Sequence, residues 1–551
     1  MQFSFPQRPI IIHNLHTENY DLLVIGGGIT GAGIALDAAS RGLKTALVEK
    51  NDFAFGTSSR STKLIHGGLR YLKQLEFGLV KEVGSERAVV HNLAPHLVVP
   101  EKMLLPLSEK KGFGYWLTSL GLKLYDWLAG VKPRDQRKML SRAQTLSNEP
   151  LLRDDDVKGG AIYAEYRTDD ARLTIEIIKA AVQHGADCVS YTQVTDFLYE
   201  QNNVHGAVVK DLVTNDSYTI RAHAVVNAAG PWVDELREIN KSRQGKRLHL
   251  TKGVHLVVAR EKLPVQQAIY FDVDDGRMIF AIPRGRTTYI GTTDTNYTGG
   301  KEDVFPVVED ARYLIAAVNT TFPSAALTLA DVESGWAGLR PLIHEDGKSA
   351  SELSRKDEIF ESATGLISIA GGKLTGYRKM AERVVTLVVK KHFAGRKLKA
   401  CYTQDIKLAG DGFAGVEDVK LYIHAIIYQI KTVGLSEHTA RYLVENYGRQ
   451  AATILEHFST LKEPADADQR LVLAEAIFTV QNEMVVTLAD FFVRRTGLLY
   501  FDIQRLRKNK QAVARVLKDH LHWSDADLQR ELQNLDRLVD QTTGFIDRRN
   551  T

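Results

Sequence analysis

The sequence predicts an α/β domain assembled from three separated segments, an antiparallel β domain, and an all-helical C-terminal domain. Glycine-rich turns directly follow short apolar runs near residues 26–31, 230 and 371–372. Runs rich in β-forming residues alternate with charged turns from about 245 to 335, and helical periodicity fills 401–551. A chain of 551 residues also exceeds one core, because single cores stop growing near about 250 to 300 residues.

The composition is that of a globular protein, with 44% hydrophobic and 25% charged residues. The formal net charge of +4 gives no support for a nucleic-acid role. The two cysteines, Cys188 and Cys401, form no CxxC motif, which excludes a disulfide framework and fits a reducing compartment. We find no secretory signal in residues 1–20 and no apolar run of spanning length, so we expect a cytoplasmic protein whose membrane contact, if any, is peripheral.

The first segment reads as strand, turn, helix and strand. Residues 22–25 form a short apolar run, a helical pattern follows over 34–39, Gly42 ends the helix, and residues 45–48 supply a second strand. This order is the supersecondary unit on which dinucleotides bind.

Gly26, Gly28 and Gly31 give GxGxxG in the turn of this unit. The three glycines allow a tight turn, close approach to a pyrophosphate and close helix packing, and Glu49 follows where a carboxylate accepts from ribose hydroxyls. An ordinary glycine turn is the alternative, but the strand, helix and acidic residue together favour a dinucleotide site. The fingerprint alone does not decide between NAD and FAD, which share an adenine half.

The later segments favour a flavin. The loop "GTSSRSTKLIHGG" could follow an extended cofactor past its pyrophosphate, although a surface loop is the alternative. "AHAVVNAAGPWVD" runs apolar from Ala224 and breaks at Gly230, and "GLISIAGGKLTGYRKMAERVV" is again strand, glycine turn and amphipathic helix. Three such turns over 350 residues indicate one discontinuous nucleotide domain, whereas an NAD domain is usually continuous.

The chain resembles the FAD-dependent glycerol-3-phosphate dehydrogenases, the respiratory enzymes of aerobic glycerol catabolism. The motifs that carry the resemblance run in the family's order from about residue 18 to the end: "IGGGITGAGIALDAASRGL", "TSSRSTKLIHGGLRYL", "NAAGPWVD", "KGVHLVV", "IGTTDT", "GLRPL", "RKDEI" and "GGKLTGYRKMAE". Members often read "GGKLTTYR", so Gly376 puts a second hydroxyl there in doubt.

The resemblance implies non-covalent FAD in a Rossmann-like domain. The implied cofactor-binding residues are Gly26, Gly28, Thr30, Gly31, Glu49, Thr57, Ser58, Ser59, Ser61, Lys63, Leu64, His66, Val194 through its backbone, Gly230, Gly372, Lys373 and Leu374. Because the family binds FAD without a covalent link, we interpret His66 as a wall residue. We find no calcium-loop pattern and expect no metal site.

The resemblance also implies the substrate site, with His255, Arg340 and Lys373 catalytic and Arg70, Tyr71 and Arg355 binding substrate. Guanidinium and ammonium groups suit a phosphate dianion, and a neutral histidine suits proton removal from an alcohol. Each type of residue has another interpretation when taken alone: His255 as a core histidine, Arg340 as a solvated turn residue, and Arg70 as half of a surface ion pair.

We predict the domain boundaries from these patterns. The discontinuous FAD-binding domain takes 18–100, 150–245 and 336–395, the substrate and membrane-proximal domain takes 101–149 and 246–335, and the helical C-terminal domain takes 401–551. Ser436 and Ser524 are the expected N-caps of two C-terminal helices, the latter with Asp527 in a capping box. That domain could cap the site, support a homodimer or meet a partner.

The segment "GYWLTSLGLKLYDWLAGVKPRDQRK" has an apolar helical face, flanking aromatic residues and a basic tail. This pattern is typical of an interfacial helix, but taken alone it slightly favours a helix packed on its own protein. The resemblance favours peripheral attachment to the inner face of a bacterial membrane, because these dehydrogenases deliver electrons to membrane quinone.

Three functions are considered. The first is oxidation of sn-glycerol 3-phosphate to dihydroxyacetone phosphate, by hydride transfer from C2 to FAD and then to quinone. The second is the related oxidase, which passes electrons to oxygen and makes hydrogen peroxide. The third, a flavin-binding protein without turnover, is disfavoured because His255, Arg340 and Lys373 are all present.

Overall fold

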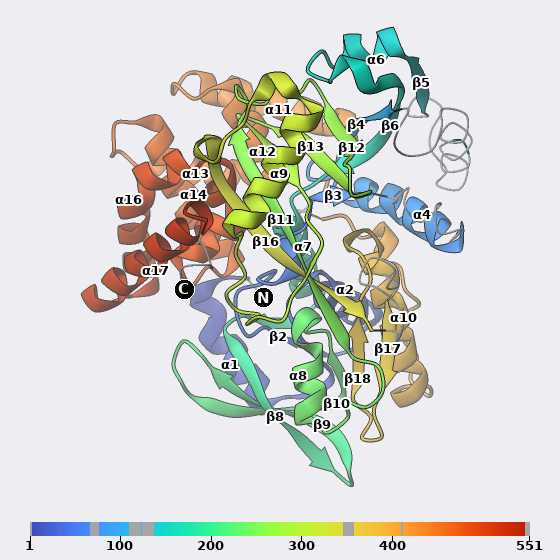
Figure 1. Ribbon diagram of the computed structural model, residues 1–551. Coiled ribbons are helices and arrows are strands. Elements are labelled where there is room, and N and C mark those ends of the chain that lie inside the picture. The colour runs from blue at the N-terminus through green and yellow to red at the C-terminus, as the bar shows by residue number, and fades with distance from the viewer. Residues whose placement is uncertain are drawn as a thin grey trace.

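The computed structural model describes residues 3–66, 77–108, 123, 137–344, 357–408 and 412–545. Figure 1 shows two sheets, with the strands labelled β2, β10 and β18 below and those labelled β4, β6, β11, β12, β13 and β16 above. The C-terminal helices α13, α14, α16 and α17 flank the upper sheet. The predicted fold class is confirmed: an α/β nucleotide-binding part, a mainly antiparallel sheet and a helical C-terminal part.

Parallel strands form the centre of the lower sheet. Within the described residues its strands, in order, are β17 (Glu358–Glu361), β18 (Ile367–Ala370), β10 (Ser217–Asn227), β1 (Asn19–Ile25), β2 (Thr45–Val48) and β7 (Asp187–Val189), with β8 (Thr192–Glu200) and β9 (Asn203–Asp211) beyond β10. The register pairs Ile25 with both Val48 and Asn227, so the strands end together at one edge. The apolar runs at 22–25 and 45–48 are buried strands, as predicted.

Helix α2 (Ile29–Arg41) packs between α7 (Asp170–Gln183) and α10 (Tyr377–His392). A Cβ added at Gly33 would lie 2.9 Å from the Tyr377 ring, so a glycine is needed where α10 crosses. Gly42 ends α2 in the left-handed conformation with φ of 101°, as predicted. The other helices of this part are α1 (Arg8–Thr17), α4 (Phe77–Leu93) and α8 (Val233–Ile239).

The upper sheet is mixed. Its described strands run β15 (Thr295–Asn296), β11 (Leu248–Ala259), β14 (Thr287–Gly291), β13 (Met278–Arg284), β12 (Ala268–Asp272), β4 (Val99–Ser108), β6 (Val157–Arg167) and β3 (Leu64–Ile65), with β16 (Val332–Ile343) beside β11 and β5 (Lys138–Ser141) beside β6. The pairs are antiparallel except for β12 with β4, which is parallel. Helix α6 (Arg142–Asn148) contacts β6 of this sheet, and helix α9 (Val308–Thr321) contacts β11.

The two faces of β11 contribute to different hydrophobic clusters, because successive side chains of a strand point to opposite faces of the sheet. Val254, Leu256 and Val258 pack with α9 in one cluster. Val257 belongs to a second cluster that includes residues of the C-terminal helices. His255 shares the face of Val257, which directs it away from α9.

The domain boundaries stay a prediction. Strands β3, β6 and β16, which lie wholly or partly in the predicted segments 18–100, 150–245 and 336–395, pair in the upper sheet. Strand β16 continues past 335 because it pairs with β11 along its length, up to Ile343 opposite Leu248. Such long-range pairing leaves no local signal at the boundary.

The C-terminal part is helical, as predicted. Its elements are α11 (Val416–Lys431), α12 (Glu437–Tyr447), α13 (Ala451–Thr460), α14 (Ala467–Glu483), a π-helical turn (Asp490–Arg495), α15 (Leu498–Phe501), α16 (Ile503–Leu521) and α17 (Asp525–Thr543). Ser436 caps α12 and Ser524 caps α17 with Asp527 in a capping box, so both predicted caps are confirmed.

None of the helices in the described ranges combines the length and the apolar character needed to cross a bilayer. The predicted amphipathic segment at 114–138 lies almost entirely outside those ranges, so its conformation stays a prediction.

Candidate active site and cofactor site

The three glycine turns meet at the carboxyl edge of the lower sheet. They follow β1, β10 and β18, and the register pairs Ile25 with Asn227 and Asn227 with Ser368. A Cβ added at Gly26 would lie 2.6 Å from the carbonyl oxygen of Ala228, so the first two turns are in direct contact. In open parallel sheets this edge is where ligands bind.

The first turn has the backbone geometry of a pyrophosphate-binding loop. Gly26 has φ of +112°, and a Cβ at Gly31 would overlap the carbonyl oxygen of Gly26, so neither position accepts another residue without rearrangement. Gly28 is the N-cap of α2 and Thr30 lies in its first turn. The free N–H groups and positive dipole of this helix start suit a phosphate.

Glu49 is fixed at the end of β2 by two backbone groups. One carboxylate oxygen accepts from Gly27 N at 2.6 Å and the other from Asn51 N at 2.9 Å. Burial raises the pKa of Glu49, although these hydrogen bonds oppose the shift. A carboxylate oxygen can accept more than one hydrogen bond, so both oxygens retain capacity for ribose hydroxyls.

The loop at 57–66 connects this turn with the upper sheet. Ser58 Oγ accepts from Ile29 N at 2.9 Å, and Thr57 Oγ1 donates to the carbonyl oxygen of Leu339 on β16 at 2.6 Å. Ser59 is buried, Ser61 Oγ accepts from Lys63 N, and Leu64 is buried in β3. The backbone of His66 bonds the Thr375 hydroxyl in both directions, at 3.2 Å.

The side chain of Lys63 is held by carboxylates of the protein. Its Nζ lies 2.5 Å from Asp170 and 3.6 Å from Asp169, which in turn accepts from Arg284 at 2.9 Å. Burial disfavours the charged ammonium, but the two carboxylates outweigh burial and raise the pKa of Lys63. Lys63 was predicted as a cofactor residue, and these contacts leave its backbone as the part available for that role.

His255 lies on β11 at the centre of the upper sheet. Register places it opposite Gly291 on β14 and Trp336 on β16, and its ring stacks on the Trp336 indole with centroids 4.8 Å apart. Its Nε2 lies 3.0 Å from Thr62 Oγ1, whereas its buried Nδ1 has no hydrogen-bond partner among the described residues. Burial, with Arg340 and Lys63, lowers the pKa of His255 well below 6.5. The imidazole is therefore neutral at pH 7.

Arg340 extends from β16 towards the same place. Its guanidinium donates to Thr292 Oγ1 at 2.8 Å and to both the Thr293 carbonyl oxygen and Asp294 at 3.1 Å. The guanidinium lies over Gly253 of β11, where a Cβ would be 2.6 Å from Arg340 Cζ. Arg340 and the neutral His255 thus lie on the paired strands β16 and β11, close enough for the charge of Arg340 to help lower the pKa of His255.

The third glycine turn, at residues 371–372, is also joined to the loop at 57–66. Gly372 has φ of +80°, and Lys373 precedes the 3₁₀ turn Leu374–Gly376, which opens α10. The bond between Thr375 and His66 ties this turn to the loop at 57–66. Among the other predicted residues, Gly230 has open space within 4 Å of an added Cβ. Val194 lies two residues after Thr192, whose N–H donates to the carbonyl oxygen of Glu49 at 2.8 Å.

The structure therefore assembles the predicted residues that it describes into a single region. Arg70, Tyr71 and Arg355 lie outside the described residues. Sequence reasoning missed Thr62, Trp336 and Asp294, which hold His255 and Arg340. Thr62 and Asp294 lie inside the quoted motifs "TSSRSTKLIHGG" and "IGTTDT" and could have been noticed, whereas only strand pairing reveals Trp336.

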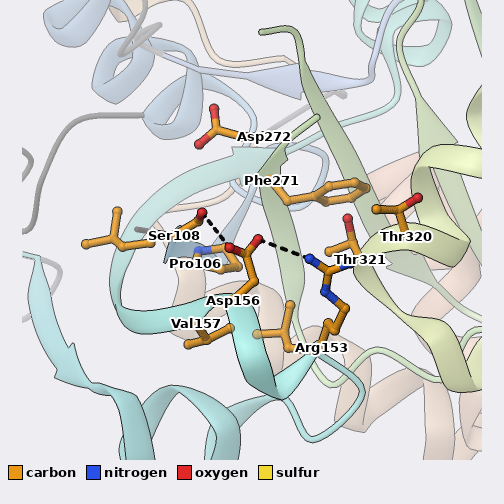
Figure 2. Close-up of a pocket in the computed structure, with 11 residues that line it drawn as sticks. Pro106, Ser108, Arg153, Asp156, Val157, Phe271, Asp272, Thr320 and Thr321 are labelled. Atoms are coloured by element: carbon orange, nitrogen blue, oxygen red, sulfur yellow. Dashed lines mark hydrogen bonds and ion pairs between the residues drawn. The ribbon is translucent and has the colours of Figure 1, made fainter. Parts of the chain in front are cut away.

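A separate pocket lies between β4, the start of β6, the end of β12 and the end of α9. Figure 2 shows Arg153 and Ser108 both directed at Asp156, with Phe271 on the opposite wall. Its described lining residues include none of the predicted site residues.

Comparison with known proteins identifies the family. Residues 21–378 match the FAD dependent oxidoreductase family, and residues 401–528 match the C-terminal domain of alpha-glycerophosphate oxidase. The aerobic glycerol-3-phosphate dehydrogenase of Bacillus subtilis is 49% identical over 98% of each chain, and that of Staphylococcus aureus strain USA300 is 48% identical, also over 98% of each. The chain belongs to the FAD-dependent glycerol-3-phosphate dehydrogenases.

Solved structures agree with this family. The glycerol-3-phosphate dehydrogenase from Bacillus halodurans, complexed with FAD, matches with a TM-score of 0.85 and 45% identity over 99% of each chain. The L-alpha-glycerophosphate oxidase from Mycoplasma pneumoniae matches at 19% identity with a TM-score of 0.56, over 71% of this chain and 98% of its own, which shows a shared fold alone. The protein is thus an FAD-dependent oxidoreductase, as its sequence predicted.

The residues of this dehydrogenase fit FAD. The Gly26–Gly31 turn leaves no room for a side chain against its own backbone, the α2 N-terminus presents free N–H groups, and Glu49 is fixed with acceptor capacity in reserve. The turn and the helix N-terminus suit the pyrophosphate of a dinucleotide, and Glu49 suits its ribose.

Proposed function

We propose that the protein oxidises sn-glycerol 3-phosphate to dihydroxyacetone phosphate in glycerol catabolism, with electrons passing from FAD to membrane quinone. The observation that supports it most strongly is the pairing of a buried, neutral His255 with the guanidinium of Arg340 beside the cofactor loop. FAD, when bound, supplies the acceptor for the hydride that leaves C2 of the substrate.

His255 removes the proton of the C2 hydroxyl. Thr62 Oγ1 lies 3.0 Å from Nε2 and can donate or accept a hydrogen bond; we assign it as the acceptor of the Nε2–H, which gives the tautomer whose Nδ1 carries a lone pair. Nδ1 has no partner among the described residues, and the low pKa of the ring keeps it unprotonated at neutral pH. The base is therefore ready before substrate binds.

Arg340 stabilises the oxygen from which that proton leaves. Its three contacts with Thr292, Thr293 and Asp294 hold the guanidinium in place, so little reorganisation is needed as negative charge develops. Placing a preorganised cation at the developing alkoxide is the contribution that usually dominates in such sites.

The phosphate is the remaining recognition group. A dianion is bound best by guanidinium forks and an ammonium, and we assign Arg70, Arg355 and Lys373 to it with Tyr71 as a neighbour. Replacing Arg70 by alanine should raise the KM for glycerol 3-phosphate strongly with a smaller effect on kcat. Unchanged steady-state kinetics would remove Arg70 from the site.

The cofactor contacts divide by chemistry. Gly26, Gly28 and Gly31 with the α2 N-terminus take the pyrophosphate, Glu49 takes the adenosine ribose, and the Gly372–Leu374 turn takes the flavin end. The N–H groups at the start of α10 would suit the negative charge of a reduced isoalloxazine bound at this turn.

The acceptor is tested by reoxidation. The purified holoenzyme is mixed anaerobically with sn-glycerol 3-phosphate until the flavin absorbance bleaches, and then either oxygen or a soluble quinone is admitted. Fast reoxidation by quinone alone supports the dehydrogenase, whereas fast reoxidation by oxygen with peroxide formation would make the protein an oxidase.

For location, we propose the cytoplasm, with peripheral attachment to the inner face of a bacterial membrane through the basic and apolar segment at 114–138. Lysates fractionated at low salt should leave the protein with membranes, and high salt should release it. Complete recovery in the soluble fraction at low salt would contradict attachment. A homodimer, which light scattering would reveal, stays a prediction.

A further inference from the structure

A buried carboxylate joins the nucleotide-binding part to the C-terminal helices. Asp52 lies three residues after Glu49 and is fully buried. Arg495 binds it through both terminal nitrogens, Nη1 to Oδ2 at 2.7 Å and Nη2 to Oδ1 at 2.9 Å, and Arg494 Nε donates to the same carboxylate. Both arginines are buried and come from the π-helical turn Asp490–Arg495, more than 430 residues away in sequence.

The loop that carries Asp52 is part of the cofactor site on both sides. On one side, Asn51 N donates to Glu49 Oε1 at 2.9 Å. On the other, Ala54 N donates to the carbonyl oxygen of Gly27 at 3.0 Å, and a Cβ at Gly27 would lie 2.7 Å from the Phe53 ring. Any movement of Asp52 is therefore transmitted to Glu49 and to the glycine turn.

The turn that holds Asp52 is itself fixed. Asp490 accepts from Val486 N and Thr487 N, both at 2.9 Å, and from the Tyr191 hydroxyl at 2.6 Å. The backbone of Tyr191 connects this turn to the loop of Asp52, because its N–H donates to the carbonyl oxygen of Asn51 at 2.9 Å. The π-helical turn is therefore joined to the loop of Asp52 at two points: through Arg494 and Arg495 at Asp52, and through Tyr191 at Asn51.

Stability alone gives a weak reason for such a cluster. The attraction within a buried ion pair is largely offset by the loss of hydration, and apolar residues of similar volume are often as stabilising. What apolar packing lacks is directional bonding, and a bidentate arginine fixes a carboxylate in both distance and orientation. π-helical turns are also frequent at functional sites.

We propose that Arg494 and Arg495 are positioning residues for FAD: by holding Asp52, they fix the loop that presents Glu49 to the adenosine ribose. The C-terminal helical domain thereby completes the cofactor site without contacting the cofactor. The inference rests on the proposed role of Glu49, which the experiment tests separately.

The test measures the FAD dissociation constant of purified holoenzymes from the free flavin fluorescence released on dilution. Asp52→Asn keeps the volume and removes the charge, and it should raise the dissociation constant about tenfold, within the range for coupled neighbouring residues. The matched control is Asp37→Asn, which breaks a buried Arg–Asp pair with Arg41 on α2 and should leave FAD affinity within about twofold.

A double-mutant cycle distinguishes positioning from general loosening of the fold. Glu49→Gln alone should weaken FAD binding about tenfold or more, because it removes a charged hydrogen-bond acceptor. If Asp52 acts through Glu49, adding Asp52→Asn to Glu49→Gln should raise the constant by no more than about twofold. Should Asp52→Asn not fold, Arg495→Lys keeps the charge and loses the fork, and it takes the same place in the cycle.

Two results would overturn the proposal. The first is an unchanged FAD affinity for Asp52→Asn with a melting temperature lowered as in Asp37→Asn, since the cluster would then be structural. The second is full additivity with Glu49→Gln. Failure of Glu49→Gln to weaken FAD binding would instead refute the proposed role of Glu49, and the two failures are thus distinguishable.

Discussion

Gly253 is the position where a single methyl group tests the role of Arg340. A Cβ in Gly253→Ala would lie 2.6 Å from Arg340 Cζ and 2.7 Å from Thr292 Oγ1, whereas ordinary contacts begin at 3.4 Å. The guanidinium must retreat by close to 1 Å, which lengthens its bonds to Thr292 and Asp294. A displacement of about 1 Å at a reacting group costs on the order of 100-fold in rate, so we expect kcat/KM to fall about 100-fold.

The assay is steady-state oxidation of sn-glycerol 3-phosphate with a soluble quinone, together with thermal unfolding of the holoenzyme. Overpacking costs about 1–3 kcal/mol of stability, which the unfolding curve will show as a lowered melting temperature. The control is Gly300→Ala, because an added Cβ there meets nothing within 4 Å. Unchanged kcat/KM in Gly253→Ala, or an equal loss in both variants, would refute the assigned role of Arg340.

Three further predictions concern histidines. Because burial lowers the pKa of His255 well below 6.5, kcat/KM should hold steady as pH falls from 7 to 6.5, with its acid limb at lower pH; a limb above 6.5 would contradict a neutral buried base. Thr62→Val should lower kcat about two- to twelvefold through loss of one orienting hydrogen bond of about 0.5–1.5 kcal/mol, and an unchanged kcat would mean that Thr62 does not orient the ring. His96 is buried against Phe413 with both ring nitrogens unpartnered among the described residues, and burial lowers its pKa to about 3. The unfolded chain therefore binds a proton below about pH 6.5 that the folded protein refuses, so folding stability is lost as pH falls from 6.5 towards 3. His96→Phe should remove this loss, and urea midpoints at pH 7 and 5.5 should show its advantage over the unsubstituted protein growing at pH 5.5.

Local patterns predicted the local elements well. Residues 45–48 form β2, Gly42 ends α2, and Ser436 and Ser524 cap their helices, because each depends on neighbours within about one helical turn. The glycine turns were also predictable, because backbone crowds the Cβ position at Gly26 and Gly31, and Gly230 and Gly372 have positive φ.

Long-range pairings limited the rest. The extension of β16 beyond the predicted boundary, and with it the place of Trp336 under His255, follows from register with β11 and has no local signature. The predicted interpretation of Lys63 as a cofactor residue could not anticipate Asp169 and Asp170, which lie more than 100 residues away. The family resemblance implied the role of each site residue, and the structure identified the neighbours that hold those site residues in place.

The central claim is that His255 removes the hydroxyl proton while sn-glycerol 3-phosphate reduces the bound flavin. Anaerobic stopped-flow mixing of the holoenzyme with saturating substrate measures this step directly, as the rate at which the flavin absorbance bleaches. The account predicts rapid bleaching in the unsubstituted protein and a rate at least about 100-fold lower in His255→Ala, the lower bound for a general base. No bleaching in the unsubstituted protein, or equal rates in both, would contradict it.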